Sequence, residues 1–126
     1  MYFLGVIHLL MQMDEYEVLS NLFKALSEPI RIRIFMLICH GEICVCEIQE
    51  VLNEPQSKVS RHLSYLRHSG IIEAKRVGRW MHYSVRKDMD PSIKAHIQFI
   101  RDRCSSFEIF EKDLQRLKEL KRKKIC

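Results

Sequence analysis

The stretch "QSKVSRHLSYLRHSGII", residues 56–72, decides the fold class. Val59, Leu63 and Leu66 recur at helical spacing, which predicts a helix over about 55–69 with one apolar face. Gly70 is a typical residue just after a helix end, so we expect the helix to stop there. The opposite face carries hydroxyls and a guanidinium: Ser57, Ser60, Arg61 and Ser64. A helix with these two faces packs on a core and offers a polar surface to a partner.

The flanking segments predict a winged helix-turn-helix. After the helix, "IIEAKRVGRWMHYSV" (residues 71–85) alternates like two short strands joined near Gly78. Before it, apolar spacing predicts helices over 14–27, from about 27 to 41, and over 44–52. Pro29 fits the first turn of the second of these helices. The predicted class is mainly α (α+β), with residues 1–13 as an N-terminal extension, 14–90 as a DNA-binding domain and 91–126 as a dimerisation helix with a basic tail.

Composition narrows the class of partner. The net charge is +5 and the pI is about 9.0, which favours a polyanion, and nucleic acid more than a membrane surface. Five cysteines in a chain that is 47% hydrophobic do not form a complete disulfide framework, so we expect a reduced, cytoplasmic setting. The first thirteen residues lack the features of a secretory signal. No phosphate loop or H-E-x-x-H motif is present, and we expect no enzyme.

The helix-turn-helix interpretation predicts which residues contact double-stranded DNA. The second helix of such a motif enters the major groove with its N-terminal residues nearest the bases, and arginines at the wing tip suit phosphates or the minor groove. The predicted DNA-binding residues are Gln56, Ser57, Lys58, Ser60, Arg61, His62, Ser64, Arg76 and Arg79. Glutamine and arginine can pair with base edges, while lysine and serine also suit phosphates. The alternative is an ordinary solvated helix face.

The region after Pro91 predicts one long amphipathic helix. Its apolar positions, at steps of three and four, are Ile93, Ile97, Ile100, Cys104, Phe107, Leu114 and Leu117. Such a stripe is longer than a small domain covers by itself, so we expect a second copy of the chain to bury it. A homodimer would then bind a pseudo-palindromic operator.

The segment "ICVCEI", residues 43–48, places Cys44 and Cys46 at the start of the predicted 44–52 helix. A helix N-terminus lowers thiol pKa values and so favours the thiolates that soft ions bind. Side chains two apart on a regular helix project in nearly opposite directions. One ion can therefore hold both sulfurs only if the first turn is not helical. Binding of the ion thus competes with formation of the first helical turn. Burial of Cys44 on the apolar face is the alternative explanation.

Four segments in order resemble the ArsR/SmtB family of metal-responsive winged-helix repressors: "LFKALSEPIRIRIFMLI", "ICVCEI", "QSKVSRHLSYLRHSGII" and "RVGRWMHYSV", within residues 15–85. The CVC segment is most similar to arsenical-responsive members. This resemblance implies a homodimeric repressor of an arsenic-resistance operon, without an organic cofactor, that As(III) or Sb(III) releases from DNA by binding Cys44 and Cys46. A third cysteine often follows three residues later, but Gln49 stands there. The third ligand could be solvent, a cellular thiol, Cys39, Cys104 or Cys126.

Other hypotheses remain open from the sequence. A redox sensor would close a Cys44–Cys46 disulfide under oxidant. The cadmium or lead type needs thiols in the N-terminal arm, yet no cysteine precedes Cys39, and the zinc type needs a second histidine to accompany His96. A DNA-binding protein without a small effector would ignore every thiophilic ion.

Overall fold

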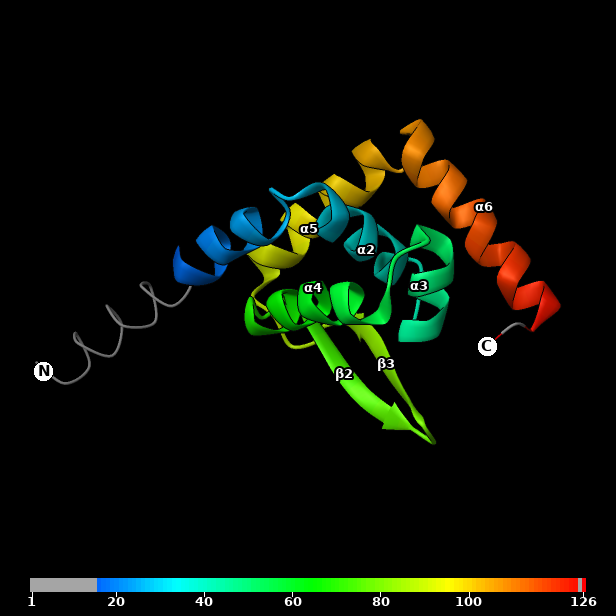
Figure 1. The fold of residues 1–126 in the computed structure, drawn as a ribbon. Helices are drawn as coiled ribbons and strands as arrows, with labels where there is room; N and C mark the ends of the chain where they lie inside the picture. Colours follow the sequence, from blue (N-terminus) through cyan, green and yellow to red (C-terminus); the bar gives the residue numbers. More distant parts are fainter. Residues whose placement is uncertain (1–15, 125) are drawn as a thin grey trace, which may run out of the picture.

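The computed structural model describes residues 16–124 and 126, and it has the element order of a winged helix (Figure 1). The predicted extension, residues 1–13, lies outside the described residues. A helix over residues 16–25 comes first. The elements that follow are α2 (Pro29–Cys39), β1 (Ile43–Cys44), α3 (Val45–Leu52), α4 (Gln56–His68), β2 (Ile72–Val77), β3 (Trp80–Val85), α5 (Pro91–Cys104) and α6 (Glu108–Lys123). The predicted fold class is confirmed.

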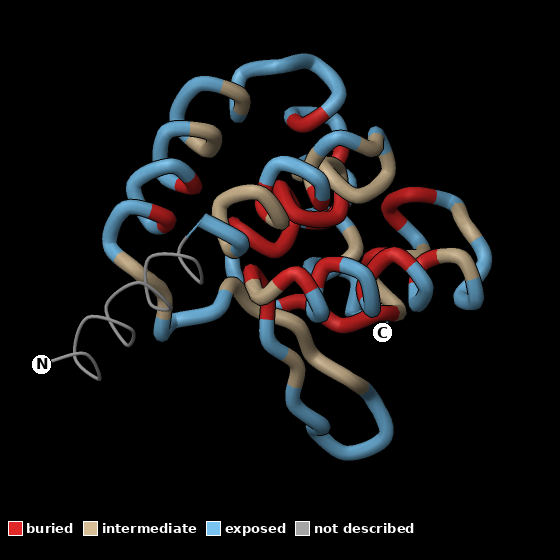
Figure 2. Tube along the Cα trace, turned by 90° about the vertical axis from the view of Figure 1, so that its left-hand side faces the viewer, coloured by how far each residue is buried: buried red, intermediate tan, exposed pale blue. Residues whose placement is uncertain are grey.

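The core forms where α2, α3 and α4 face one another. Ile34, Phe35, Ile48, Leu63 and Leu66 are completely buried there. Figure 2 shows the buried segments gathered between the helices, while the hairpin projects away from them. Full burial of each such side chain stabilises the fold by about 1.5–3 kcal/mol. Packing of α3 and α4 on this core fixes the orientation of the helix-turn-helix.

The predicted start of α2 is confirmed, with Glu28 as the capping residue. The Glu28 carboxylate accepts a hydrogen bond from the Arg31 backbone N–H at 3.0 Å, and Pro29 occupies the first turn. The Ser27 hydroxyl donates instead to the Lys24 carbonyl at 2.7 Å and closes the preceding helix. Both ends of this helix-to-helix turn are therefore satisfied by local side chains.

The hairpin is confirmed and carries a third strand that the sequence did not indicate. Strands β2 and β3 pair antiparallel from Ile72↔Val85 to Val77↔Trp80, and Gly78 turns between them with φ +62°, a conformation that favours glycine. The two-residue strand β1 pairs with the other edge of β3, with Cys44 opposite His82, so the sheet order is β1-β3-β2. The thiol segment is thereby attached to the wing.

The expectation of one continuous C-terminal helix is wrong. Helix α5 ends at Cys104, Phe107 is extended (ψ 134°), and α6 begins at Glu108. Helix α6 then turns back along the body and lies beside α3 (Figure 1). Asp113 on α6 accepts two hydrogen bonds from the Arg33 guanidinium on α2, at 2.9 and 2.8 Å. Packing of α6 against its own chain replaces the straight seam that the pattern predicted.

None of the helices described for residues 16–124 has the length and apolar character needed to cross a membrane.

Candidate DNA interface and thiol site

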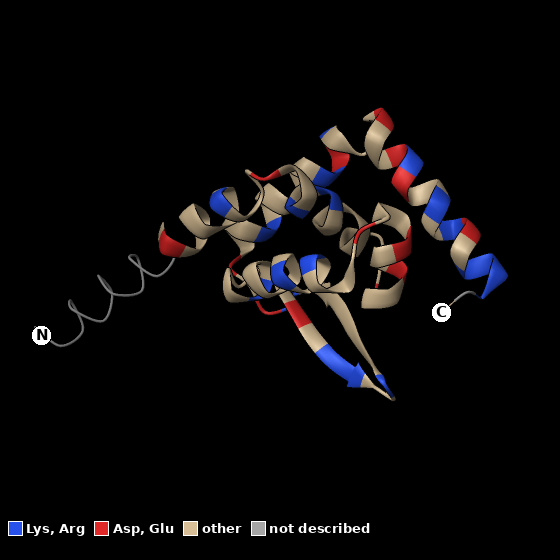
Figure 3. Cartoon of the chain, viewed as in Figure 1, with Lys and Arg blue, Asp and Glu red and all other residues tan. Residues whose placement is uncertain are grey.

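The N-terminal half of α4 presents most of the predicted DNA-binding side chains to solvent. The exposed residues are Gln56, Ser57, Ser60, Arg61 and Ser64. Lys58 is half-buried and forms an ion pair with Glu54, with Nζ and Oε1 3.3 Å apart. Figure 3 shows the basic residues of α4 and those of the hairpin on neighbouring parts of the molecule. This surface has the donors that phosphates and purine edges require.

His62 does not belong to this exposed face. Its side chain is only 8% exposed, which argues against the predicted DNA contact. The reason is helical spacing, because position 62 lies three residues after Val59 and four before Leu66, both of which are fully buried. Burial lowers the pKa of His62 and so favours the neutral imidazole.

Arg31 and Tyr65 form a contact beside α4 that the sequence analysis missed. The Arg31 guanidinium lies 4.0 Å from the centre of the Tyr65 ring. Its Nε also donates to the Ala25 carbonyl at 2.9 Å, at the end of the first helix. One side chain thus joins the first helix, α2 and α4 through a cation–π contact and a hydrogen bond. No sequence spacing pairs residues 31 and 65.

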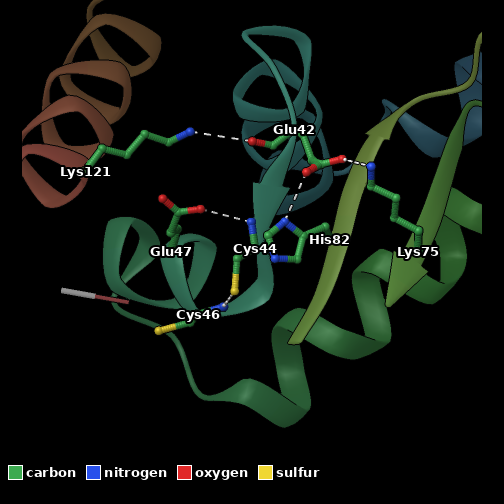
Figure 4. A network of polar contacts seen from close by, with 7 residues as sticks. All are labelled: Glu42, Cys44, Cys46, Glu47, Lys75, His82 and Lys121. Carbon is green, nitrogen blue, oxygen red and sulfur yellow. Dashed lines mark hydrogen bonds and ion pairs between the residues drawn. The ribbon is translucent and has the colours of Figure 1, made fainter. Parts of the chain in front are cut away.

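The wing carries its predicted arginines at the tip and a salt-bridged base. Arg76 and Arg79 are exposed. At the base, the Glu42 carboxylate lies 2.9 Å from Lys75 Nζ and 3.2 Å from His82 Nδ1 (Figure 4). The hydrogen bond from Lys75 is the main cause that lowers the pKa of Glu42. Glu42, which the sequence analysis did not single out, therefore connects the segment before the thiols to the hairpin.

Cys44 caps α3 with its sulfur. Its backbone is extended (φ −85°, ψ 148°), its side chain is 5% exposed, and Sγ accepts the Cys46 N–H at 3.3 Å. In return, Glu47 Oε1 accepts the Cys44 N–H at 3.0 Å, which completes a capping box (Figure 4). The Cys44 side chain is therefore buried, as the alternative explanation predicts, and its sulfur is also part of the cap at the start of α3.

Cys46 is bonded to the last residue of the chain. Cys46 and Cys126 form a disulfide across a sequence separation of 80, with 6.2 Å between their Cα atoms. In Figure 4 the Cys46 sulfur points away from Cys44. The Cys44–Cys46 bridge of the redox hypothesis is absent from the described residues, where Cys44 is a free thiol. Among residues 16–124 and 126, no group of three Cys, His, Asp or Glu side chains is already arranged to hold a metal ion.

The two remaining cysteines lie on the α5 side of the protein. Cys39 is buried, and burial raises the pKa of its thiol to about 12. It lines a pocket together with Arg101 and Asp102 of α5. Cys104 is half-buried near the end of the same helix. Of the three candidate third ligands, Cys126 is the one that the structure places against Cys46.

The predicted dimerisation residues divide between core and surface. Ile93, Ile97 and Leu117 are buried within their own chain, so their burial does not require a second copy. Leu114 packs on that core, Ile100 and Cys104 are half-buried, and Phe107 is 54% exposed.

Two aromatic side chains, one on the first helix and one on α5, are mostly exposed to solvent. Phe99 is 65% exposed and Phe23 is 54% exposed, and the Phe23 ring contacts His96 edge to face with ring centres 6.4 Å apart. Neither Phe23 nor Phe99 is among the predicted dimerisation residues.

Comparison with known proteins gives consistent matches. Residues 28–74 match the family described as bacterial regulatory protein, arsR family. An uncharacterised helix-turn-helix type transcriptional regulator of Methanocaldococcus jannaschii is 35% identical over 70% of this chain and 97% of its own length. An arsenic resistance transcriptional regulator of Pseudomonas putida is 38% identical over 62% of this chain and 69% of its own. Among solved structures, HlyU from Vibrio cholerae superposes with a TM-score of 0.59 at 25% identity, covering 68% of this chain and 89% of that one.

Proposed function

Because the chain belongs to the arsR family of bacterial regulatory proteins, and is therefore a DNA-binding transcriptional repressor and not an enzyme, we propose that As(III) or Sb(III) is its inducer. In this proposal the homodimer binds a pseudo-palindromic operator, and the metalloid releases it by binding Cys44 and Cys46. The observation that carries the proposal is the Cys44 cap, because the sulfur that would bind the ion also holds the first turn of α3. Thiolates are the soft ligands that such an ion needs.

The competition between cap and ligand explains how binding could reach the DNA. Cys44 Sγ accepts the Cys46 N–H, and the Cys46 sulfur points elsewhere, so both sulfurs can meet one ion only if this turn rearranges. Helix α3 packs directly on α4, and Cys44 pairs with His82 in the wing. A rearranged cap therefore perturbs the two elements that contact DNA. Reciprocity requires that DNA weaken ion binding by the same factor, with a typical coupling of about 1–3 kcal/mol.

A DNA-binding titration at fixed, stated salt tests the proposal. Arsenite should release the wild-type protein from operator DNA, whereas Cys44→Ser and Cys46→Ser should bind DNA but resist release. Serine is itself a good N-cap, so Cys44→Ser preserves the start of α3 while it removes the soft ligand. Cys39→Ser is the matched control and should respond like wild type. If both Cys44→Ser and Cys46→Ser are released by arsenite at wild-type concentrations, the proposal is wrong.

The Cys46–Cys126 disulfide favours a second candidate, a thiol redox sensor. In that function, oxidation would attach the end of α6 to the first turn of α3 and alter operator affinity. Mass spectrometry after mild peroxide, combined with DNA titration of the oxidised and reduced protein, separates the two candidates. A bridge that forms without any change in operator affinity would eliminate redox sensing.

For the homodimer we propose a surface on the first helix and α5. Phe23 and Phe99 are large and exposed, the Phe23 ring contacts His96 three residues before Phe99 on α5, and Ile100 on the same helix is half-buried. Burial of these side chains against a second copy would remove apolar area from water. Sedimentation of Phe99→Glu should give a monomer where wild type gives a dimer; an unchanged dimer would exclude this surface.

A further inference from the structure

We infer that Cys126 supplies the third thiol of the metalloid site, so that the end of α6 closes over an ion held by Cys44 and Cys46. The inference rests on the proposed function of that pair. It goes beyond it by assigning a ligand from the far end of the chain, 80 residues away in sequence from Cys46. It also gives α6 a role in the inducer site.

Helix α6 is held where this role requires it to be. Asp113 accepts two hydrogen bonds from Arg33 on α2, and Leu117 is buried in the core. Further along, Arg116 Nη1 donates to the Val51 carbonyl of α3 at 3.2 Å, and Lys121 Nζ to the Glu42 carbonyl at 3.5 Å. These contacts lead along α6 toward the thiol segment, and they end with the Cys126 sulfur bonded to that of Cys46.

The other residues considered for the third position are less suited. Gln49 stands where a third cysteine would follow on α3, and its amide offers no soft atom. Cys39 is buried and lines a pocket with residues of α5, and Cys104 is half-buried at the end of α5. Cys126 is exposed and already within bonding distance of Cys46.

The chemistry balances once the disulfide is reduced. A dithiol reductant breaks the Cys46–Cys126 bond, gives two protein thiols and becomes a disulfide itself. Arsenous acid, As(OH)3, then reacts with the thiols of Cys44, Cys46 and Cys126. Each thiol forms one As–S bond and its proton leaves with one hydroxyl, so three water molecules are released. While the disulfide persists, two of the three ligands are unavailable, and the oxidised protein cannot form the complete site.

Two arsenicals that differ in valence test the inference on the reduced full-length protein. Arsenite takes three thiols, whereas phenylarsine oxide has one position blocked by carbon and takes two. Cys126→Ser should bind arsenite at least about tenfold more weakly than wild type. It should bind phenylarsine oxide unchanged, because Cys44 and Cys46 remain. X-ray absorption of the arsenite complexes should count three sulfur neighbours in wild type, and two sulfurs with one oxygen in Cys126→Ser.

Matched controls separate this inference from the proposal on which it rests. Cys104→Ser removes another thiol near the C-terminal helices and should bind both arsenicals like wild type. Equal arsenite affinity and three sulfur neighbours in Cys126→Ser would overturn the third-ligand assignment alone. Phenylarsine oxide binding that survives in Cys44→Ser/Cys126→Ser and in Cys46→Ser/Cys126→Ser, each of which keeps only one thiol of the site, would instead overturn the assignment of the pair, and with it the proposed function.

Discussion

Loss of one partner of the Arg33–Asp113 pair should cost several kcal/mol and should detach α6. The Asp113 side chain is 8% exposed and that of Arg33 is 25% exposed, and two hydrogen bonds of 2.9 and 2.8 Å join them. Removal of one partner of a fully buried pair costs about 3–5 kcal/mol. Because Arg33 keeps some contact with water, we expect Asp113→Ala to lie at the lower end, at about 3 kcal/mol. With a urea slope of about 2 kcal/mol/M, the unfolding midpoint should fall by about 1.5 M.

The double variant Arg33→Met/Asp113→Leu is the decisive control. It removes both charges and replaces them with apolar side chains, so it should unfold within about 1 kcal/mol of wild type even though each single variant is much weaker. Both measurements use dithiol-reduced protein, which excludes any contribution from the disulfide. An Asp113→Ala effect below about 1 kcal/mol, or a double variant whose loss equals the sum of the two single losses, would refute the reasoning.

Three further predictions concern the disulfide, a buried histidine and the wing. The chain-entropy model gives about 4.5 kcal/mol for a cross-link over a separation of 80, so wild type should unfold at higher urea when oxidised than when reduced, and Cys126→Ser should show no difference. Burial lowers the pKa of His62, so the unfolded chain binds a proton at this residue more readily than the folded chain. The free energy of unfolding should therefore fall as the pH drops through about 6.5, and it should fall less steeply in His62→Gln. Arg79→Ala should weaken operator binding and reduce the salt slope by about one, and an unchanged slope would exclude a phosphate contact.

The recognition helix and the hairpin could be predicted because their signals are local. Val59, Leu63 and Leu66 define a face within one helix, and strand alternation around Gly78 lies within fifteen residues. The same pattern places His62 beside Leu63 on the buried side, so its spacing argues against the predicted DNA contact.

The break between α5 and α6 could not be read from the sequence. No proline or glycine interrupts residues 92–124, and apolar residues continue at steps of three and four across Ser105. Tertiary contacts decide the break, because α6 must turn back for Asp113 to bind Arg33, eighty positions earlier, and for Leu117 to enter the core. Periodicity reports which face is apolar but not which partner covers it. The apolar stripe that was predicted to pack on a second copy of the chain therefore packs partly against its own chain.

The same limit applies to the thiol site, where the local part was predictable and the distant parts were not. The sequence indicated that Cys44 and Cys46 compete with the start of α3, and the Sγ cap gives that idea a specific atom. It did not indicate strand β1, through which Cys44 also pairs with His82, nor the approach of Cys126. Since Cys44 belongs to α3 by its cap and to the wing by its strand, an ion that displaces it should disturb both DNA-contacting elements together. A coupling of a few kcal/mol then requires only small shifts in each element, because both changes reduce affinity for the same operator.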